Sequence, residues 1–134
     1  MRVLSEYIGL PFKRHGRDFE GVDCYGLVWL WHREQRNRLL PDFLGQISGE
    51  PSAGEIANVF EAGRSLPAFE QVHPPQVGDI VFFRVNGLPS HCGLVVGLGR
   101  FLHIAQDHAS CLEYWTSPKW ADRVVGFYRF REGA

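Results

Sequence analysis

The sequence is poor in cysteine and has no paired cysteine motif. Only three cysteines, Cys24, Cys92 and Cys111, occur in 134 residues, and no two of them form a CxxC pair. An odd number without such a pair argues against a disulfide scaffold and against a zinc ribbon. We therefore expect at least one free thiol.

An excess of charge of either sign is also lacking. Fourteen Lys and Arg residues stand against fifteen Asp and Glu residues, which leaves a formal net charge of -1. A protein with this balance has no global basic field to gather nucleic acid. We therefore expect no nucleic-acid partner.

Long hydrophobic runs are absent as well. No stretch approaches the roughly 20 apolar residues of a membrane-spanning helix. The first seven residues, Met1 to Tyr7, lack the uninterrupted apolar core of a signal peptide. We expect no membrane insertion, and we expect synthesis in the cytoplasm without an export signal in this sequence.

What is present is the composition of a globular domain, with 45% hydrophobic and 22% charged residues. The length suits one core, so we predict a single domain over residues 1–134. Residues 39–75 hold several of the eight prolines, and we interpret them as a connection or insertion within this domain. A short helix is predicted there from Ser52, because Ser52 and Glu55 have the spacing of a capping box.

A longer helix is predicted from Cys24 to about Asn37. The polar, glycine-punctuated segment before it ends in Asp23, a residue type that caps helix N-termini. Apolar residues then recur at the spacing of one helix face, at Cys24, Leu27, Val28 and Trp31. Cys24 is therefore expected in the first turn, on the buried stripe.

Short β-rich runs separated by turn residues follow Pro75. We predict strands over 79–85, 91–96, 101–105, 111–115 and 124–130, arranged as an antiparallel meander. A helical first half and a strand-rich second half indicate an α+β fold, with the Cys24 helix on one face of the sheet.

Cys24 is the first candidate for chemistry. The first turn of a helix offers unpaired N–H groups and the positive end of the helix dipole, and both favour a thiolate. A buried structural cysteine is the alternative, since free cysteine is among the most buried residue types. A nucleophilic thiol also needs a base and a group that orients the base, so partners decide between the two interpretations.

Two of the six histidines fall in predicted strands, His91 and His103. The other four, His15, His32, His73 and His108, are interpreted as solvated or locally hydrogen-bonded side chains. A three-residue loop at residues 97–99 places His103 opposite Gly93 and diagonal to His91, on the same face. A two-residue loop at residues 98–99 sends the two imidazoles to opposite faces.

If the helix packs on the face that the two histidines share, His103 orients His91 and His91 deprotonates Cys24. The same three side chains match the ligand types of a zinc site, but their spacing lacks the usual paired-ligand signature. We therefore expect no metal and no cofactor. Cys92, on the opposite face from His91, and Cys111 are interpreted as core residues.

Several ordered motifs carry a family resemblance over most of the chain. They are Tyr7-Ile8-Gly9-Leu10-Pro11-Phe12, Gly16-Arg17-Asp18, Gly21-Val22-Asp23-Cys24-Tyr25-Gly26-Leu27-Val28, Leu40-Pro41-Asp42, Val77-Gly78-Asp79-Ile80-Val81-Phe82-Phe83, Ser90-His91-Cys92-Gly93-Leu94-Val95-Val96-Gly97, Phe101-Leu102-His103 and Val125-Gly126-Phe127-Tyr128-Arg129. This ordered set resembles the NlpC family of papain-like cell-wall cysteine peptidases, especially its short phage-tail members.

The resemblance implies a papain-like α+β fold and a cysteine peptidase without cofactor. It implies Cys24 as nucleophile, His91 as general base and acid, and His103 as the group that orients His91. The implied substrates are peptidoglycan stem peptides, often at the bond between γ-D-glutamate and a diamino acid. The backbone N–H of Cys24 is the expected oxyanion donor, with Asp23, Phe12 and Tyr25 beside the substrate.

Two positions depart from the family pattern. Phe12 stands where many members have a tyrosine whose hydroxyl lies near the active site, and Tyr25 stands where many have serine. An aromatic residue at position 25 is frequent in phage-tail relatives, so we expect tail-tip or tail-assembly partners and a place in a virion or phage-like tail acting on the cell wall.

Two alternatives stay open at the level of sequence. A structural tail subunit that keeps the fold with weak or no activity is favoured by Phe12. Acyl transfer or deamidation by the same three residues is also possible chemically, because an amine as well as water resolves a thioester.

Overall fold

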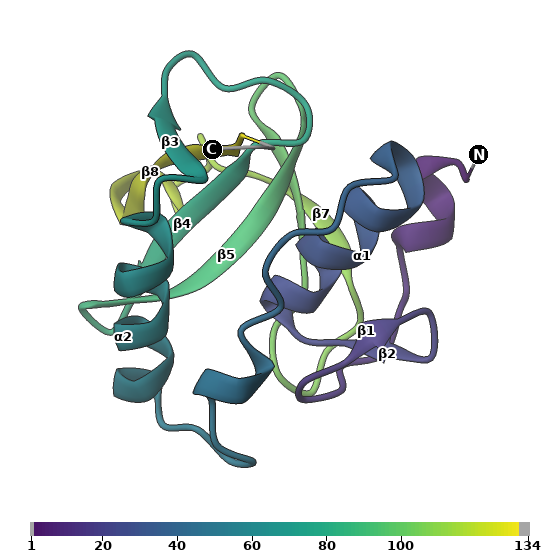
Figure 1. Cartoon of the computed structure of the whole chain (residues 1–134). Coiled ribbons are helices and arrows are strands. Elements are labelled where there is room, and N and C mark those ends of the chain that lie inside the picture. Colours follow the sequence, from purple (N-terminus) through teal and green to yellow (C-terminus); the bar gives the residue numbers. More distant parts are fainter. Residues whose placement is uncertain (1, 132–134) are drawn as a thin grey trace.

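Two α-helices and a six-stranded sheet make up most of the computed structural model, which describes residues 2–131 (Figure 1). In chain order the elements are η1 (Leu4–Tyr7), β1 (Arg17–Asp18), β2 (Gly21–Val22), α1 (Cys24–Arg36), η2 (Leu44–Gln46), α2 (Ala53–Arg64), β3 (Phe69–Val72), β4 (Ile80–Val85), β5 (Leu88–Gly97), β6 (Arg100–His103), β7 (Cys111–Tyr114), η3 (Ala121–Arg123) and β8 (Val124–Phe130). Met1 and residues 132–134, which the predicted domain includes, lie outside the described residues. None of the helices in residues 2–131 is long and apolar enough to cross a membrane.

Helix α1 begins where the sequence predicts. The Asp23 carboxylate accepts a hydrogen bond from the backbone N–H of Gly26 at 2.7 Å, which satisfies one of the free donors of the first turn. The helix ends at Arg36, because Asn37 adopts the left-handed conformation (φ 49°) and its N–H bonds to the carbonyl of His32. The predicted N-cap and the predicted extent of the helix are confirmed.

Residues 39–75 contribute a helix and a strand to the fold. Ser52 Oγ accepts from the N–H of Glu55 at 3.1 Å, so α2 begins as predicted. The Glu55 carboxylate bonds to the N–H and hydroxyl of Ser48, and the reciprocal half of a capping box is therefore not formed with Ser52. Strand β3 was not predicted, because its four residues are too few to show a period of two.

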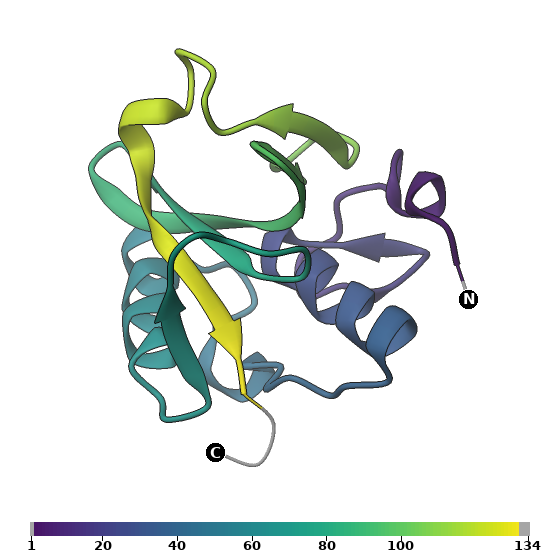
Figure 2. The same ribbon diagram turned by 90° about the horizontal axis from the view of Figure 1, so that it is seen from above.

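The strand order of the sheet is β3-β8-β4-β5-β6-β7, with every neighbouring pair antiparallel. Strands β4 to β7 form the predicted meander. The prediction is wrong for β8, which returns across the sheet to pair with β4 and β3; Figure 2 shows this yellow strand beside β3. A two-stranded ribbon, β1 and β2, lies in the polar, glycine-punctuated segment before α1, where no strand was predicted.

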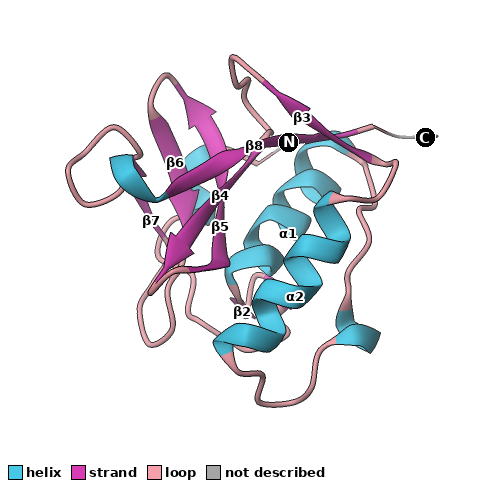
Figure 3. Ribbon diagram, turned by 90° about the vertical axis from the view of Figure 1, so that its left-hand side faces the viewer, coloured by secondary structure: helices cyan, strands magenta, loops and turns pink. Residues whose placement is uncertain are grey.

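Hydrophobic side chains cover both faces of the sheet. Both helices pack on one face, where Leu27 and Val28 of α1 share a core with Cys92, Leu94 and Leu102 (Figure 3). The other face carries a smaller core of Val81, Phe83, Val95, Phe101 and Trp120. This arrangement of helices on an antiparallel sheet confirms the predicted α+β class.

Candidate active site

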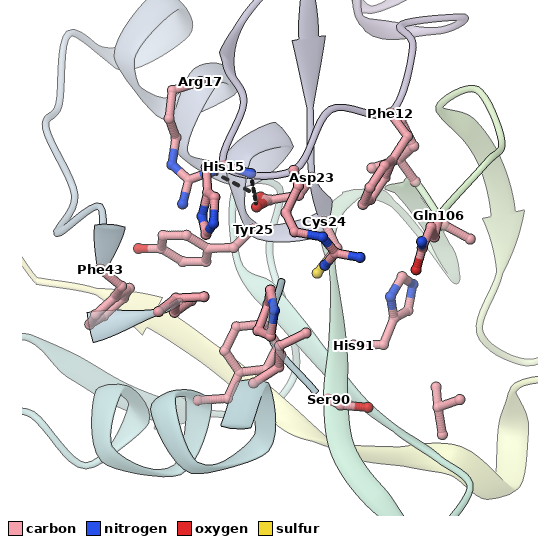
Figure 4. Close-up of a pocket in the computed structure, with 18 of the residues that line it drawn as sticks. Phe12, His15, Arg17, Asp23, Cys24, Tyr25, Phe43, Ser90, His91 and Gln106 are labelled. Carbon is pink, nitrogen blue, oxygen red and sulfur yellow. Dashed lines mark hydrogen bonds and ion pairs between the residues drawn. The ribbon is translucent and has the colours of Figure 1, made fainter. Parts of the chain in front are cut away.

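A cleft of about 340 Å³ opens between the N-terminal end of α1, the start of α2 and strand β5 (Figure 4). Its walls are mainly apolar and aromatic, with a few polar and basic groups. The lining residues are Phe12, Arg14, His15, Arg17, Asp23, Cys24, Tyr25, Phe43, Ile47, Pro51, Ile56, Phe60, Val85, Ser90, His91, Ile104, Ala105, Gln106, Trp120 and Arg123. A concave apolar site with a few polar groups is the usual form of a binding or catalytic site.

Cys24 lies in this cleft as a half-buried free thiol in the first residue of α1. Its sulfur interacts with the side chains of Cys92 and His91, both on β5 (Figure 4 labels His91 beside it). A hydrogen bond from the Cys92 thiol is the main cause that holds the pKa of Cys24 well below its ordinary value, and it outweighs burial. The neighbouring His91 lowers the pKa of Cys24 further.

The backbone N–H of Cys24 is free of helical hydrogen bonding by position, because the first residues of a helix have no intrahelical acceptor. It therefore stands as a donor next to the thiol, as the sequence predicts for an oxyanion site.

Asp23 lines the cleft, but its carboxylate is used inside the protein. One oxygen accepts from Gly26 N–H and from Arg17 Nη1 at 2.9 Å, and the other accepts from the N–H of His15 at 2.9 Å. These three contacts fix the loop before the helix and the first turn that carries Cys24. The structure therefore shows Asp23 supporting this turn, and its expected place beside the substrate stays a prediction.

His91 and His103 meet as predicted. His91 Nε2 lies 2.9 Å from His103 Nδ1, and both side chains are buried. The pairing Leu94 with Leu102 and Val95 with Phe101 is the register that the three-residue loop requires. Gly97 nevertheless pairs with Arg100, so the turn itself has two residues and a bulge between Val95 and Gly97 restores the register.

Helix α1 does not pack on the face that the two histidines share. Helix α1 packs on the face of Cys92, whereas the His91 ring contacts Phe83, His103 and Trp120 on the other face. Cys24 still reaches His91 because it is at the very start of α1, where the helix passes His91 and Cys92 on β5. The juxtaposition therefore depends on the end of the helix and not on its packed face.

Glu113, which was not predicted as a site residue, hydrogen-bonds His103. Glu113 Oε2 lies 2.6 Å from His103 Nε2, and the other oxygen accepts from Trp120 Nε1 at 3.0 Å. The signal was available in the register of the next hairpin: His103 pairs with Cys111, which puts Glu113 on the same face as a diagonal neighbour. Cys24, His91, His103 and Glu113 thus form a continuous series of contacts.

The aromatic residues predicted near the substrate both line the cleft. Phe12 presents a ring without a hydroxyl (Figure 4). Tyr25 is buried against Phe43, and its hydroxyl donates to the carbonyl of Pro41 at 2.7 Å. Tyr25 therefore shapes the wall of the cleft, and its hydroxyl is already paired.

Three further residues test the interpretation of the remaining cysteines and histidines. Cys92 is a core residue, as predicted, with no exposed surface. Cys111 is exposed, so its prediction as a core residue was wrong, because β7 is an edge strand of the sheet. His32 was interpreted as solvated or locally bonded, but it is buried, and its Nε2 bonds to the distant carbonyl of Gly78 at 2.8 Å.

The geometry gives little support to a zinc site at Cys24, His91 and His103, because the two imidazoles direct nitrogens at each other. A different group of three ligand types converges within residues 2–131, namely His103, Cys111 and Glu113, whose ligand atoms lie within 4.8 Å of one another. His103 and Glu113 are already joined by a hydrogen bond in this group. We therefore assign it to hydrogen bonding.

Comparison with known proteins gives a consistent result. The chain is similar to the "Probable peptidoglycan endopeptidase LytE" of Bacillus subtilis (strain 168), with 27% identity over 92% of this chain and 31% of that protein. It is similar to the "Murein DD-endopeptidase MepS/Murein LD-carboxypeptidase" of Escherichia coli (strain K12), with 24% identity over 91% of this chain and 58% of that protein. The chain thus spans less than two thirds of the length of these curated relatives.

Solved structures share the fold. An NlpC/P60 family protein from Bacillus cereus ATCC 10987 superimposes with a TM-score of 0.66 at 20% identity, over 92% of this chain and 36% of that one. The NlpC/p60 domain of the peptidoglycan hydrolase SagA gives a TM-score of 0.60 at 19% identity, over 92% and 89% of the two chains. The NlpC/P60 family model itself matches residues 9–129, and the chain therefore belongs to the NlpC/P60 family.

Proposed function

We propose that this protein is a cysteine peptidase that hydrolyses peptide bonds in peptidoglycan stem peptides. The observation that carries the proposal is the Cys24 thiol at the start of α1, in contact with His91, whose ring is held by His103 at 2.9 Å. A thiol nucleophile, a base and a group that orients the base are the parts that covalent acyl transfer requires. The similar LytE and MepS proteins are named as peptidoglycan or murein endopeptidases, which supports the same substrate class here.

The proposed reaction has two stages. The Cys24 thiolate attacks the scissile carbonyl, and the backbone N–H of Cys24 stabilises the oxyanion that forms. The C–N bond then breaks as His91 gives its proton to the leaving amine, which leaves a thioester on Cys24. Water, deprotonated by His91, attacks the thioester, and the thiolate is released with the new carboxylate.

His91 Nδ1 is the nitrogen that serves Cys24 in this scheme, because Nε2 faces His103. The aromatic ring of Trp120 lies stacked on His91, with centroids 5.6 Å apart, and limits the rotation of the imidazole. His103 thus holds the Nε2 edge of the His91 ring, and Trp120 packs against its face.

The charge of the cleft fits an anionic peptide. Arg14 and Arg123 both line it, each above an aromatic ring, Phe12 and Trp120 respectively. Neither guanidinium has an ion pair within residues 2–131. Free guanidinium groups bind carboxylates. This supports the bond between γ-D-glutamate and a diamino acid as the point of cleavage, because the α-carboxylate of that glutamate remains free.

The proposed setting is the tail of a phage or phage-like particle, where the protein meets tail-tip or tail-assembly proteins and the cell wall. Its support is the resemblance of the sequence motifs, including the aromatic Tyr25 directly after Cys24. A structural tail subunit with weak or no activity is the second candidate. The specific observation in its favour is Phe12, which brings no hydroxyl into the cleft.

Digestion of purified peptidoglycan and of defined stem peptides tests the proposal. We would compare the wild-type protein, Cys24→Ala and the control Ser65→Ala, and identify the products by mass spectrometry. Ser65 is exposed at the C-terminal end of α2 and does not line the cleft, so its change to alanine controls for the loss of a small polar side chain away from the site. We expect cleavage by wild type and Ser65→Ala, and none by Cys24→Ala.

Product mass separates the chemical alternatives. Hydrolysis adds the mass of one water across the cleaved bond, whereas acyl transfer to an added amine gives a product that carries the amine. Equal cleavage by the Cys24→Ala protein would refute the proposed nucleophile. Absence of cleavage by the folded wild-type protein, together with its assembly into tails, would favour the structural subunit.

A further inference from the structure

We propose that Glu113 is a positioning residue for the active site. It fixes the tautomer of His103 in which Nδ1 accepts a hydrogen bond from the N–H at Nε2 of His91. This inference rests on the proposed function for its catalytic meaning, but the hydrogen-bonded arrangement that it predicts is measurable without substrate. It adds a fourth side chain, on β7, to the three that the sequence motifs indicate.

Both ring nitrogens of His103 are occupied. Nδ1 lies 2.9 Å from His91 Nε2, and Nε2 lies 2.6 Å from Glu113 Oε2. A carboxylate can only accept, so Nε2 of His103 must carry the proton. Nδ1 of a neutral His103 then carries a lone pair, which accepts a hydrogen bond from the N–H at Nε2 of His91. This leaves Nδ1 of His91 for the Cys24 proton.

The ionised state of Glu113 is supported by its surroundings. Burial alone raises the pKa of Glu113, but the hydrogen bonds from Trp120 and His103 lower it on balance below its ordinary value. Burial is also the main cause that lowers the pKa of His103, so this ring is neutral near pH 7. A neutral imidazole between a carboxylate and His91 has one donor and one acceptor, as the two contacts require.

Five other titratable groups act on the two histidines or on their partners within residues 2–131. Cys24 contacts His91 from the start of α1, Cys92 follows His91 on β5, and the Asp23 carboxylate acts on both thiols. Lys119, before η3, acts on both His103 and Glu113, and Cys111 Sγ lies 3.7 Å from His103 Nε2. Glu113 is the group among these that hydrogen-bonds the far nitrogen of His103 as an anion.

Trp120 makes Glu113→Gln an informative variant. The indole N–H of Trp120 donates to Oε1 of Glu113 at 3.0 Å, so the carbonyl oxygen of a glutamine is drawn to that position. The amide NH₂ then faces His103 Nε2 and donates to it. The proton of His103 moves to Nδ1, where it points at His91 Nε2, and His91 can no longer hold protons on both nitrogens. The ion pair of the Cys24 thiolate and protonated His91 is thereby lost.

Two readouts follow for Glu113→Gln. We expect the pH midpoint of Cys24 alkylation by iodoacetamide, measured on the Cys24 peptide by mass spectrometry, to rise by about one to two pH units, which corresponds to the tenfold to hundredfold effect of removing a hydrogen-bond partner of a metal-binding histidine. We expect kcat on a stem peptide to fall by a similar factor with little change in KM, since neither His103 nor Glu113 lines the cleft in residues 2–131.

Glu70→Gln is the matched control. Glu70 also forms an ion pair, with Arg131 at 2.6 Å, but it lies on β3, at the opposite edge of the sheet from β7. The Glu70→Gln change should leave the rate and the pH dependence of Cys24 alkylation unchanged. If Glu113→Gln matches Glu70→Gln in alkylation rate and in the pH midpoint of alkylation, the inference is overturned.

A measurement on the wild-type protein needs no variant. Long-range ¹H–¹⁵N NMR spectra of the histidine rings report which nitrogen bears the proton, and we expect His103 to be protonated at Nε2 near pH 7. Protonation at Nδ1 would overturn the inference even if Glu113→Gln fails to fold. A failure of the proposed function gives a different pattern, with the expected tautomer and alkylation profile but no cleavage of stem peptides.

Discussion

Asp23→Ala should destabilise the protein strongly, because one carboxylate holds the loop and the helix start on which Cys24 depends. It accepts from Gly26 N–H at 2.7 Å, and from His15 N–H and Arg17 Nη1 at 2.9 Å each. The Asp23 and Arg17 side chains are only 18% and 10% exposed. Alanine removes all three acceptor contacts and leaves the Arg17 guanidinium without its ion pair.

The magnitude follows from these contacts. Loss of an N-cap costs about 1 kcal/mol. Removal of one partner from a largely buried ion pair costs about 3–5 kcal/mol, because the remaining charge stays desolvated. The two effects share one carboxylate oxygen and overlap, so we expect a loss of about 4 kcal/mol in the free energy of unfolding. For a chain of this length, that corresponds to a fall in Tm of about 10–15 °C.

Urea unfolding followed by circular dichroism measures this loss, with Asp18→Ala as the control. Asp18 lies on β1, next to Arg17, and its side chain is exposed. It accepts one hydrogen bond, from the N–H of Glu20 at 2.9 Å. We expect Asp18→Ala to lose less than about 1 kcal/mol. If Asp23→Ala loses no more than Asp18→Ala, the role assigned to the Asp23 carboxylate is refuted.

Two further predictions concern protonation. Cys92→Ala removes the thiol that is the main cause of the low pKa of Cys24, so the pH midpoint of Cys24 alkylation should rise, and an unchanged midpoint would contradict that cause. Burial lowers the pKa of His32 to about 4 in the folded protein, from an ordinary value of about 6.5. The buried neutral ring therefore stabilises the fold fully above pH 6.5, and this stabilisation is lost as the pH falls through 4. Wild type should therefore lose about 3 kcal/mol more than His32→Gln between pH 7 and pH 4 in urea unfolding, and parallel losses would exclude His32 as the source.

The local elements of the fold were predictable from sequence. The N-cap Asp23 and the apolar period of α1 are signals within one segment, whereas counting residues in the β5–β6 hairpin leaves two registers open. The register that brings His91 and His103 together is set by a bulge beside a two-residue turn, which the loop length alone does not predict.

The parts that the sequence did not reveal depend on contacts between distant segments. The pairings of β8 with β4 and with β3 join residues roughly forty to sixty positions apart, and no local pattern encodes them. Cys111 has the residue type of a core position, but β7 lies at the sheet edge. The register of the β6–β7 hairpin could have placed Glu113 near His103, but its second contact, with Trp120, is visible only in the folded structure.

Trapping the acyl-enzyme would establish Cys24 as the nucleophile. The wild-type protein is mixed with a stem peptide, quenched in acid within its first turnovers, and analysed by mass spectrometry of the intact chain and of its peptides. We expect an added mass equal to the acyl half of the substrate, attached at Cys24. Cleavage without any adduct on Cys24, and of equal rate in Cys24→Ala, would contradict it.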